Sequence, residues 1–273
     1  MKRNIRNSVV IITGASSGIG LACARVFYSE GAKLVLAARS EEIIRKLADE
    51  FNAKGEIRAI AVKTDVAIEN DCKHLIDKAI ETFGKIDILI NNAGVSMRAN
   101  FFDVKLDVLK RLMDINFWGT VYCTKYAYPP IIASKGSIVG ISSVAGIHGM
   151  PCRTGYSASK YAVQGFLDAV RIETMKKGIQ VLVVTPGFIS TNIRKTALVA
   201  DGSTQEESPR DESKMMSPEE LAKRIVKGIK RNRRQLATSY DGRFTPILSL
   251  FFPRLVDKIY YSYIKREPNT PLD

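Results

Sequence analysis

The 273-residue sequence predicts an α/β fold in a single domain, a Rossmann-like doubly wound parallel sheet in three layers. Short apolar runs rich in β-branched residues alternate along the chain with stretches whose apolar residues have helical spacing. The apolar runs are nearly uninterrupted, as is typical of parallel strands covered by helices on both faces. Glycine residues stand where the predicted helices should end, which supports the same boundaries.

The expected elements alternate from the first strand to the sixth. The strands are predicted at Val9–Thr13, Lys33–Ala38, Ile57–Val62, Ile86–Ile90, Ser137–Ile141 and Val181–Thr185. The helices are predicted at Ile19–Glu30, Glu41–Asn52, Glu69–Phe83, Asp107–Tyr128 and Ala158–Lys177, and a further helix opens at Ser217. Helix starts and ends are indicated by Ser40 before two glutamates and by Gly31, Gly84 and Gly178. No linker divides the chain, so residues 1–240 are expected to form one domain, followed by a tail over residues 241–273.

Charge and cysteine usage restrict the class of protein. The 41 basic and 28 acidic residues give a net charge of +13, which favours phosphorylated cofactors, anionic lipid surfaces or nucleic acid as partners. Cys23, Cys72, Cys123 and Cys152 lack metal-ligand spacing, so we expect small buried residues and no metal site. The basic start, Met1 to Asn7, has no secretory hydrophobic region, and no apolar stretch reaches the ~18–20 residues of a membrane span. A cytoplasmic protein, with any membrane contact peripheral, is predicted.

A glycine-rich turn follows the first strand and opens the first helix. It reads Thr13-Gly14-Ala15-Ser16-Ser17-Gly18-Ile19-Gly20. Glycines let the backbone approach a pyrophosphate, and the free amides at the helix N-terminus favour its negative charge. A tight turn without ligand is the alternative for this motif taken alone.

The T-G-x-x-x-G-x-G spacing resembles that of the short-chain dehydrogenase/reductase family. Further motifs match in order, at Asn91-Asn92-Ala93-Gly94, Ser143, Tyr156 to Lys160 and Pro186-Gly187, so the resemblance runs from near residue 8 to about residue 235. With its basic and apolar tail, the chain looks like the membrane-associated dehydrogenase/reductase branch that includes 11β-hydroxysteroid dehydrogenase-like members.

The second strand favours NADPH over NADH. It ends in Ala37-Ala38-Arg39-Ser40, without the acidic residue that holds the ribose in NAD enzymes, and Arg39 and Ser40 can bind a 2′-phosphate. Glu41 and Glu42 are the competing candidates, and a merely solvated Arg39 is the other alternative. The resemblance implies a cofactor site made of Thr13, Gly14, Ser16, Ser17, Gly18, Ile19, Gly20, Asp65, Val66, Asn92, Ala93, Gly94, Tyr156, Lys160, Pro186, Gly187, Ile189 and Thr191.

Tyr156 and Lys160 stand i, i+4 on a predicted helix, so both side chains point to the same face. The ammonium of Lys160, together with a cationic nicotinamide ring, is expected to lower the pKa of the tyrosine. Ser143 follows the fifth strand and can reach the phenol, with Ser142 as the alternative. The resemblance adds Asn116, which implies a catalytic tetrad of Asn116, Ser143, Tyr156 and Lys160. The two histidines form no nucleophile-base arrangement, although His148 could line the substrate cleft or be an ordinary loop residue.

Residues 188–216 correspond to the variable substrate lid of the family, and the early apolar residues Phe188, Ile189, Ile193 and Leu198 suggest an apolar wall. Residues 200–216 are polar and indicate a mobile loop. The tail combines large apolar residues between Phe244 and Val256 with basic and tyrosine flanks. Either it lies on an anionic membrane surface, or it packs over the cleft or into a subunit interface.

The sequence therefore predicts an NADPH-dependent oxidoreductase for a hydrophobic ketone, aldehyde or secondary alcohol of steroid, retinoid or lipid-like type. A 3-oxoacyl-carrier-protein reductase and a non-catalytic NADPH-binding regulator are the alternatives. Nucleic acid is not expected as a partner, because the basic helix near Lys223 to Arg234 lacks interleaved aromatic residues. The resemblance implies a homodimer or homotetramer, with Trp118, Tyr122 and Phe166 available at its interface.

Overall fold

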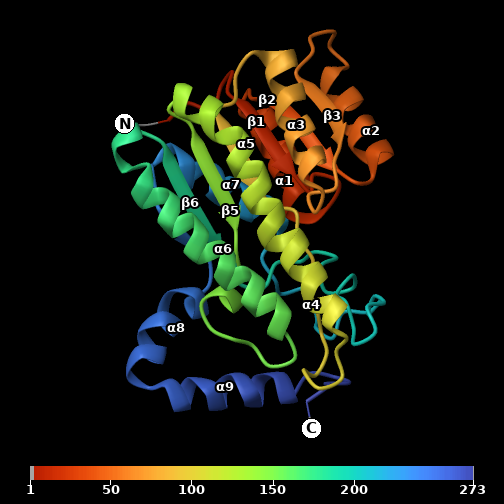
Figure 1. The fold of residues 1–273 in the computed structure, drawn as a ribbon. Helices are drawn as coiled ribbons and strands as arrows, with labels where there is room; N and C mark the ends of the chain where they lie inside the picture. Colours follow the sequence, from red (N-terminus) through yellow and green to blue (C-terminus); the bar gives the residue numbers. More distant parts are fainter. Residues whose placement is uncertain (1–2, 273) are drawn as a thin grey trace.

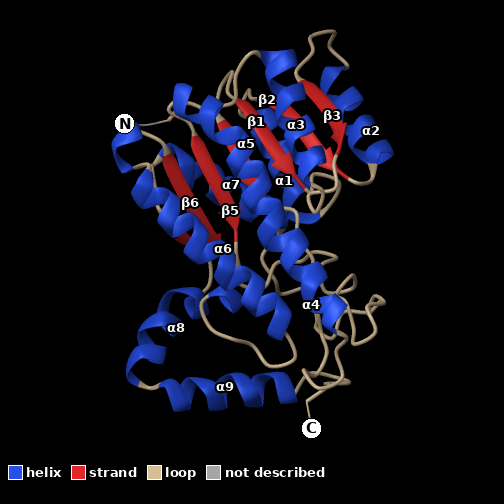
Figure 2. Cartoon of the chain, viewed as in Figure 1, coloured by secondary structure: helices blue, strands red, loops and turns tan. Residues whose placement is uncertain are grey.

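A computed structural model of the chain describes residues 3–272, except for the side chains of residues 240, 241 and 243. The first two residues of the basic N-terminus, and Asp273 and the side chain of Arg243 in the tail, therefore lie outside the described residues. The core is a seven-stranded parallel sheet with the strand order β3-β2-β1-β4-β5-β6-β7. Helices cover both of its faces (Figure 1), and Figure 2 shows the strands as the middle of three layers. This arrangement confirms the predicted fold class.

The strands are buried and send alternate side chains into two separate apolar cores. They are β1 Val9–Thr13, β2 Lys33–Ala38, β3 Ala59–Lys63, β4 Ile88–Asn91, β5 Ser137–Ile141, β6 Gln180–Thr185 and β7 Gln235–Ala237. In β1, Val10 and Ile12 pack into one core, whereas Val9 and Ile11 pack into the other. The period of two along a strand thus supplies both faces of the sheet.

Helices close the two cores. The helices are α1 Gly18–Ser29, α2 Glu41–Asn52, α3 Glu69–Phe83, α4 Leu106–Leu112, α5 Gly119–Ala133, α6 Thr154–Glu173, α7 Pro218–Lys230, α8 Tyr240–Phe251 and α9 Pro253–Lys265. Buried residues of α1, α2 and α7 fill the first core, and those of α3, α5 and α6 fill the second. All four cysteines are buried, as expected, and none forms a disulfide among the described residues.

Several predicted boundaries were wrong for identifiable reasons. The single helix expected over Asp107–Tyr128 is α4, a π-helical segment over Met113–Trp118, and α5. Helix α5 continues through Pro129 and Pro130 because Ile131, which is fully buried, anchors its last turn in the core. Tertiary packing here outweighs the helix-ending tendency of proline.

Other strand and helix ends shift by one to four residues. β3 begins at Ala59 because Ile57 is 62% exposed, and β4 begins at Ile88. Helix α6 starts at Thr154 and ends at Glu173, before a short 3₁₀ turn over Met175–Lys177. Strand β7, which the sequence did not predict, is only three residues long and sits at the edge of the sheet beside β6.

The tail forms two helices at the end of the molecule toward which the strands run (Figure 1). Helix α9 buries Val256, Tyr260 and Ile264. Val256 and Tyr260 pack against Val144 in the loop after β5. Within residues 3–272, no helix is long and apolar enough to cross a lipid bilayer.

Candidate active site

A cleft of about 580 Å³ lies at the carboxyl ends of the strands, where chain connections diverge on either side of β1 and β4. In doubly wound folds, this switch point is where ligands bind. The cleft is lined from the glycine-rich turn at one end to the substrate lid at the other. Of the predicted site residues, it contains Gly14, Ser16, Ser17, Gly18, Ile19, Arg39, Ser40, Asp65, Val66, Asn92, Ala93, Gly94, Ser143, Tyr156, Lys160, Pro186, Gly187, Ile189 and Thr191.

The glycine-rich turn has a backbone that only glycine adopts readily. Gly14 and Gly18 have φ values of 67° and 52°. At Gly20, an added Cβ would lie 2.1 Å from the carbonyl oxygen of Gly14, so the helix packs directly on the turn. Ser17, the N-cap of α1, makes no side-chain capping bond, which leaves the first amides of the helix available to an anion.

Two of the predicted cofactor residues, Thr13 and Gly20, do not line the cleft but support the turn from behind. The hydroxyl of Thr13 accepts hydrogen bonds from the backbone amides of Asn92 and Ala93, each 3.0 Å long. The side-chain amide of Asn92 donates in turn to the carbonyl oxygen of Thr13 at 2.9 Å. These bonds tie the turn after β1 to the end of β4 and fix the distance between them.

Arg39 is exposed at the end of β2 and forms no ion pair with an acidic residue in the described part of the chain. The neighbouring acids are engaged along their own helix, where Glu41 pairs with Arg45 and Glu42 with Lys46. The first-turn position of these glutamates also favours the helix N-terminus. Among the residues described, the only charged group at the end of β2 that lines the cleft is therefore the guanidinium of Arg39.

Ser143, Tyr156 and Lys160 meet at the other end of the same cleft. The ammonium Nζ of Lys160 donates to the main-chain oxygen of Ile141 at 2.9 Å and lies 5.8 Å from the ring centroid of Tyr156. The hydroxyl of Ser142 contacts the main-chain oxygen of Lys160 at 3.3 Å, so Ser142 secures the helix. The hydroxyl of Ser143 accepts from the backbone amide of Ala145 at 3.2 Å and also interacts with Tyr156.

Asn116 lies behind the wall of the cleft, 1% exposed, on the π-helical segment. Its side-chain oxygen accepts from the amide of Val95 at 2.8 Å, and its nitrogen donates to the carbonyl of Val95 at 2.9 Å. An added Cβ on Gly94 would stand 2.9 Å from the Asn116 oxygen and 3.4 Å from the Lys160 ammonium. The absence of a side chain at Gly94 thus leaves space between the asparagine and the lysine.

In the protein without bound cofactor, the pKa of Tyr156 is raised and not lowered as expected. Burial raises the pKa of Tyr156, and the hydrogen bond with Ser143 and the charges of Arg153 and Arg194 oppose this only in part. The ammonium of Lys160 is directed to a main-chain oxygen, and burial lowers the pKa of Lys160 to about 8. Desolvation is the main cause of the pKa shift of both groups, and the sequence pattern does not reveal it.

The structure adds cleft residues that sequence reasoning missed. Arg111, Arg153 and Arg194 bring positive charge to the substrate half. Arg194 is held by Glu212, with 2.8 Å between the guanidinium and the carboxylate. The available signals were the positions of Arg153 and Arg194, each three residues from a predicted site residue, Tyr156 and Thr191.

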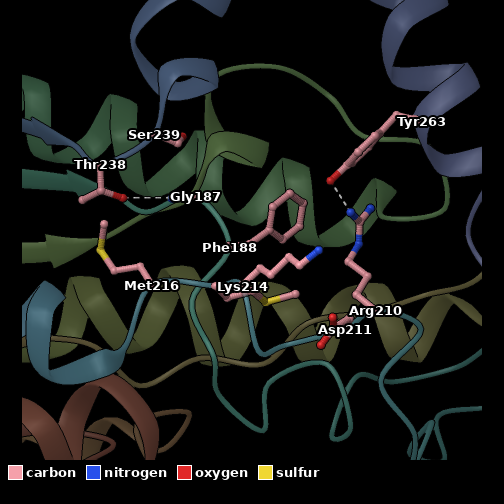
Figure 3. Close-up of a pocket in the computed structure, with 10 residues that line it drawn as sticks. Gly187, Phe188, Arg210, Asp211, Lys214, Met216, Thr238, Ser239 and Tyr263 are labelled. Atoms are coloured by element: carbon pink, nitrogen blue, oxygen red, sulfur yellow. Dashed lines mark hydrogen bonds between the residues drawn. The ribbon is translucent and has the colours of Figure 1, made fainter.

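The lid contributes the expected apolar wall, because Phe188, Ile189, Ile193 and Leu198 all line the cleft. Its polar remainder is a loop joined to the domain by isolated bridges from Leu198 to Met97 and from Met216 to Ile189. Gly187 and Phe188 also line a second cavity, of about 520 Å³, between the lid and the tail (Figure 3). His148 faces the tail instead of the cleft, and it stacks on Tyr260 with ring centroids 4.7 Å apart.

Comparison with known proteins agrees with this arrangement. The sequence model of a family described as short chain dehydrogenase matches residues 8–200. The chain is 37% identical to Dehydrogenase/reductase SDR family member 7B of Rattus norvegicus, over 97% of this chain and 84% of that protein. It is 33% identical to the Uncharacterized oxidoreductase YxnA of Bacillus subtilis (strain 168), over 98% and 77%.

A solved structure shares the fold. It is the alcohol dehydrogenase from the archaeon Thermococcus sibiricus, complexed with 5-hydroxy-NADP, with a TM-score of 0.75 at 22% identity, over 85% of this chain and 95% of that one. The relatives are dehydrogenases and reductases, which act on CH–OH groups or the corresponding carbonyls. The chain therefore belongs to the short chain dehydrogenase family and is an oxidoreductase.

Proposed function

We propose that the chain is an NADPH-dependent oxidoreductase that transfers a hydride between the nicotinamide and a hydrophobic ketone, aldehyde or secondary alcohol. One observation carries the proposal: a single cleft joins the glycine-rich turn and Arg39 at one end to Ser143, Tyr156 and Lys160 at the other. The bound NADP derivative of the structurally similar archaeal enzyme is in keeping with it.

The residues present fit a dinucleotide. The turn at Gly14 and Gly18 has no side chain to obstruct a pyrophosphate, and the uncapped start of α1 presents free amides. Arg39 offers two parallel N–H donors to a 2′-phosphate. A nicotinamide cofactor bound here supplies the hydride for reduction or accepts it for oxidation.

The protein's own groups manage the oxygen of the substrate. The hydroxyl of Ser143 donates a hydrogen bond to the carbonyl oxygen and polarises it. Tyr156 gives its phenolic proton to this oxygen as the carbon gains the hydride, which yields the alcohol and a tyrosinate. Lys160, with a pKa of about 8, can exist in both protonation states near neutral pH and returns a proton toward Tyr156. Oxidation follows the same steps in reverse.

The substrate half has an apolar wall in addition to its arginines, which supports a lipid-like, steroid or retinoid carbonyl. The lid side chains Phe188, Ile193 and Leu198 and the loop residue Met150 line it. A carrier-bound 3-oxoacyl substrate would also meet this apolar wall, and it remains the alternative enzymatic function. An NADPH-binding regulator without turnover is the alternative of another class.

The test is NADPH oxidation by the purified protein with apolar ketones and aldehydes of rising chain length in mild detergent. Turnover should rise with chain length, and Tyr156→Phe should lower it by about 10²–10⁴-fold while NADPH binding persists. Tyr161→Phe, on the same helix but bonded to the carbonyl of Ile147, is the matched control and should keep full turnover. Undiminished turnover in Tyr156→Phe would refute the mechanism, and tight NADPH binding without turnover on any compound would favour a regulator or a carrier-bound substrate.

The cofactor preference has a separate test. Arg39→Asp should lower the NADPH/NADH affinity ratio by about 10–100-fold, since a charge-assisted hydrogen bond is worth about 1.5–3 kcal/mol. Lys54→Asp, which makes the same charge change at an exposed site after α2, should leave the ratio unchanged. An unaltered ratio in Arg39→Asp would show that the guanidinium does not bind the 2′-phosphate.

We further propose that α8 and α9 rest on an anionic membrane surface. Their outward side chains are large and apolar, and Leu250, Phe251 and Phe252 are 76%, 68% and 58% exposed. Arg254, Lys258 and Arg266 are exposed in and just after α9. Apolar side chains beside cations suit the boundary between acyl chains and anionic headgroups.

Cosedimentation with vesicles tests the membrane contact. The triple variant Leu250→Ser/Phe251→Ser/Leu255→Ser should abolish pelleting with anionic vesicles, and neutral vesicles should pellet less of the unaltered protein. Ile43→Ser, which removes a half-exposed apolar side chain from α2 at the far end of the molecule (Figure 1), is the control. If the triple variant instead changes the molecular mass in solution, the same face is a subunit interface.

Proteins of this family typically form oligomers, and we propose a homodimer or homotetramer built through α5 and α6. Trp118, the last residue of the π-helical segment before α5, is 43% exposed and stacks on Tyr122, while Phe166 of α6 lies beside Phe117. Light scattering on the eluted protein should give a mass of two or four chains, and Trp118→Ser should reduce it. A monomer at micromolar concentration would refute this proposal.

A further inference from the structure

A buried ionic cluster ties the C-terminal segment to the substrate half of the cleft. The carboxylate of Glu267, two residues after α9, has a side chain that is only 3% exposed. Three guanidinium groups surround it, and they come from three separate segments of the chain. We name Glu267, Arg98, Arg153 and Arg210 the Glu267 cluster.

Each arginine links Glu267 to a different wall of the site. Arg98, in the loop after β4, donates through Nε to the carboxylate at 3.2 Å and through Nη2 to the carbonyl oxygen of Pro268 at 2.7 Å. Arg210, in the lid, donates through Nε at 2.8 Å. Arg153, in the loop before α6, lies 3.5 Å from the carboxylate. The C-terminal segment is thereby joined to every loop that encloses the substrate half.

Arg210 also holds the aromatic wall of the lid. Its guanidinium lies 4.3 Å from the ring centroid of Phe188 and 4.3 Å from that of Tyr263, and these two centroids are 6.1 Å apart, so it contacts both rings. It donates a further hydrogen bond to the hydroxyl of Tyr263 (Figure 3). Phe188 lines both the cleft and the second cavity, so Arg210 contacts a side chain that the two cavities share.

Arg153 depends on Glu267 more than the other two arginines do. Its NH1 group is buried without a hydrogen-bond partner, and its NH2 group is the one that faces the carboxylate. It stands three residues before Tyr156, and its charge favours the ionised form of that tyrosine. Without the carboxylate, a buried guanidinium would have to turn toward the water of the cleft.

We propose that Glu267 is a positioning residue for the substrate half of the cleft. It holds two walls of that half in place, the loop before α6 through Arg153 and the lid through Arg210. The expected change in KM for the substrate rests on the proposed function, whereas the expected change in hydrogen exchange of the loops does not. None of the cluster contacts involves the glycine-rich turn or the end of β2. The C-terminal segment therefore acts on substrate binding and leaves cofactor binding alone.

The kinetic test compares Glu267→Gln with Glu207→Gln, which removes an exposed carboxylate from the same lid. In Glu267→Gln, KM for the best ketone should rise about tenfold to a hundredfold, as expected for a small misplacement near the reacting groups, while KM for NADPH changes less than twofold. Glu267→Asp keeps the charge and should recover part of the loss. If Glu267→Gln only destabilised the protein, the maximal rate would fall with the fraction of folded enzyme, while KM for the ketone would stay unchanged. That result would contradict a positioning role.

Hydrogen exchange provides a readout that needs no turnover. In Glu267→Gln, exchange should rise in residues 150–156 and 205–216 and stay unchanged in residues 13–20, relative to Glu207→Gln. Unchanged exchange in the lid, a uniform rise across the molecule, or altered exchange with an unchanged KM for the ketone would each overturn the proposal. If no carbonyl is reduced by the unaltered protein, the proposed function fails, and the exchange pattern still decides whether Glu267 holds these loops.

Discussion

Replacing Lys160 by methionine should stabilise the protein at neutral pH and remove its activity. Lys160 is 4% exposed, and burial lowers its pKa from 10.5 to about 8. A tenfold change in proton affinity corresponds to about 1.4 kcal/mol, so holding the ammonium in this site costs the folded state roughly 3 kcal/mol at pH 7. Methionine has a similar length and no charge to desolvate.

The lost hydrogen bond reduces this gain. Lys160 donates to the main-chain oxygen of Ile141 at 2.9 Å, and a buried carbonyl left without its donor costs about 1–2 kcal/mol. We therefore expect Lys160→Met to be more stable than the unaltered protein by about 1–2 kcal/mol at pH 7. Stabilisation by removal of a functional group is a common property of active sites.

The pH dependence distinguishes this explanation from a simple packing effect. Between pH 8 and 10.5 the unfolded chain binds the lysine proton and the folded chain does not, so the stability of the unaltered protein rises with pH in this interval. The advantage of Lys160→Met should shrink by roughly 3 kcal/mol across this interval and change sign at about pH 9. Other groups that titrate there are common to both proteins and cancel in the difference.

The assay is urea unfolding of both proteins, followed by circular dichroism at pH 7, 8, 9 and 10. A stability difference that stays constant with pH would show that the ammonium of Lys160 is not desolvated in the folded state. A variant that is less stable at pH 7 would show that the hydrogen bond to Ile141 outweighs the burial of charge. Turnover of the same samples reports whether Lys160 is needed for reduction.

Three further predictions concern glycine and cysteine residues. Gly165→Ala on α6 should raise the free energy of unfolding by about 0.5–1 kcal/mol in urea titrations, because an added Cβ there meets no atom of the same chain within 4 Å and alanine favours helix. A loss of stability would contradict the open space at this position. Gly20→Ala should weaken NADPH binding at least tenfold in fluorescence titrations, since its Cβ would lie 2.1 Å from the Gly14 carbonyl oxygen and force the turn open. Normal affinity would contradict the packing of α1 on the turn. The four cysteines should react with a thiol reagent only after unfolding, because all are buried and burial raises the pKa of Cys23 to about 12; rapid labelling of the native protein would show an open conformation.

Local patterns in the sequence were enough to predict six of the seven strands of the sheet and much of the candidate site. Strands such as β1 are buried on both faces, so their apolar runs are continuous and visible without a structure. The glycine turn was recognisable because a backbone with positive φ at Gly14 and Gly18 restricts the residue type. The same locality explains why Tyr156 and Lys160 could be paired, since a helix brings residues i and i+4 together.

The tertiary structure decided what depends on contacts between distant segments. Helix α5 passes through two prolines because Ile131 is anchored in the core, and the pKa of Tyr156 is raised because surrounding segments exclude water. The carboxylate of Glu267 meets Arg98 across 169 positions of sequence, and no spacing rule connects residues so far apart. Sequence by itself determined six of the seven strands, most of the helices and many of the residues that line the cleft, because periodicity and backbone preference are local. The folded arrangement decided three other features, which are the desolvation of Tyr156 and Lys160, the ion pairs that join the lid to the C-terminal segment, and the exposed apolar face of α8 and α9. These features depend on burial and charge pairing, which arise only when segments distant in the sequence come together.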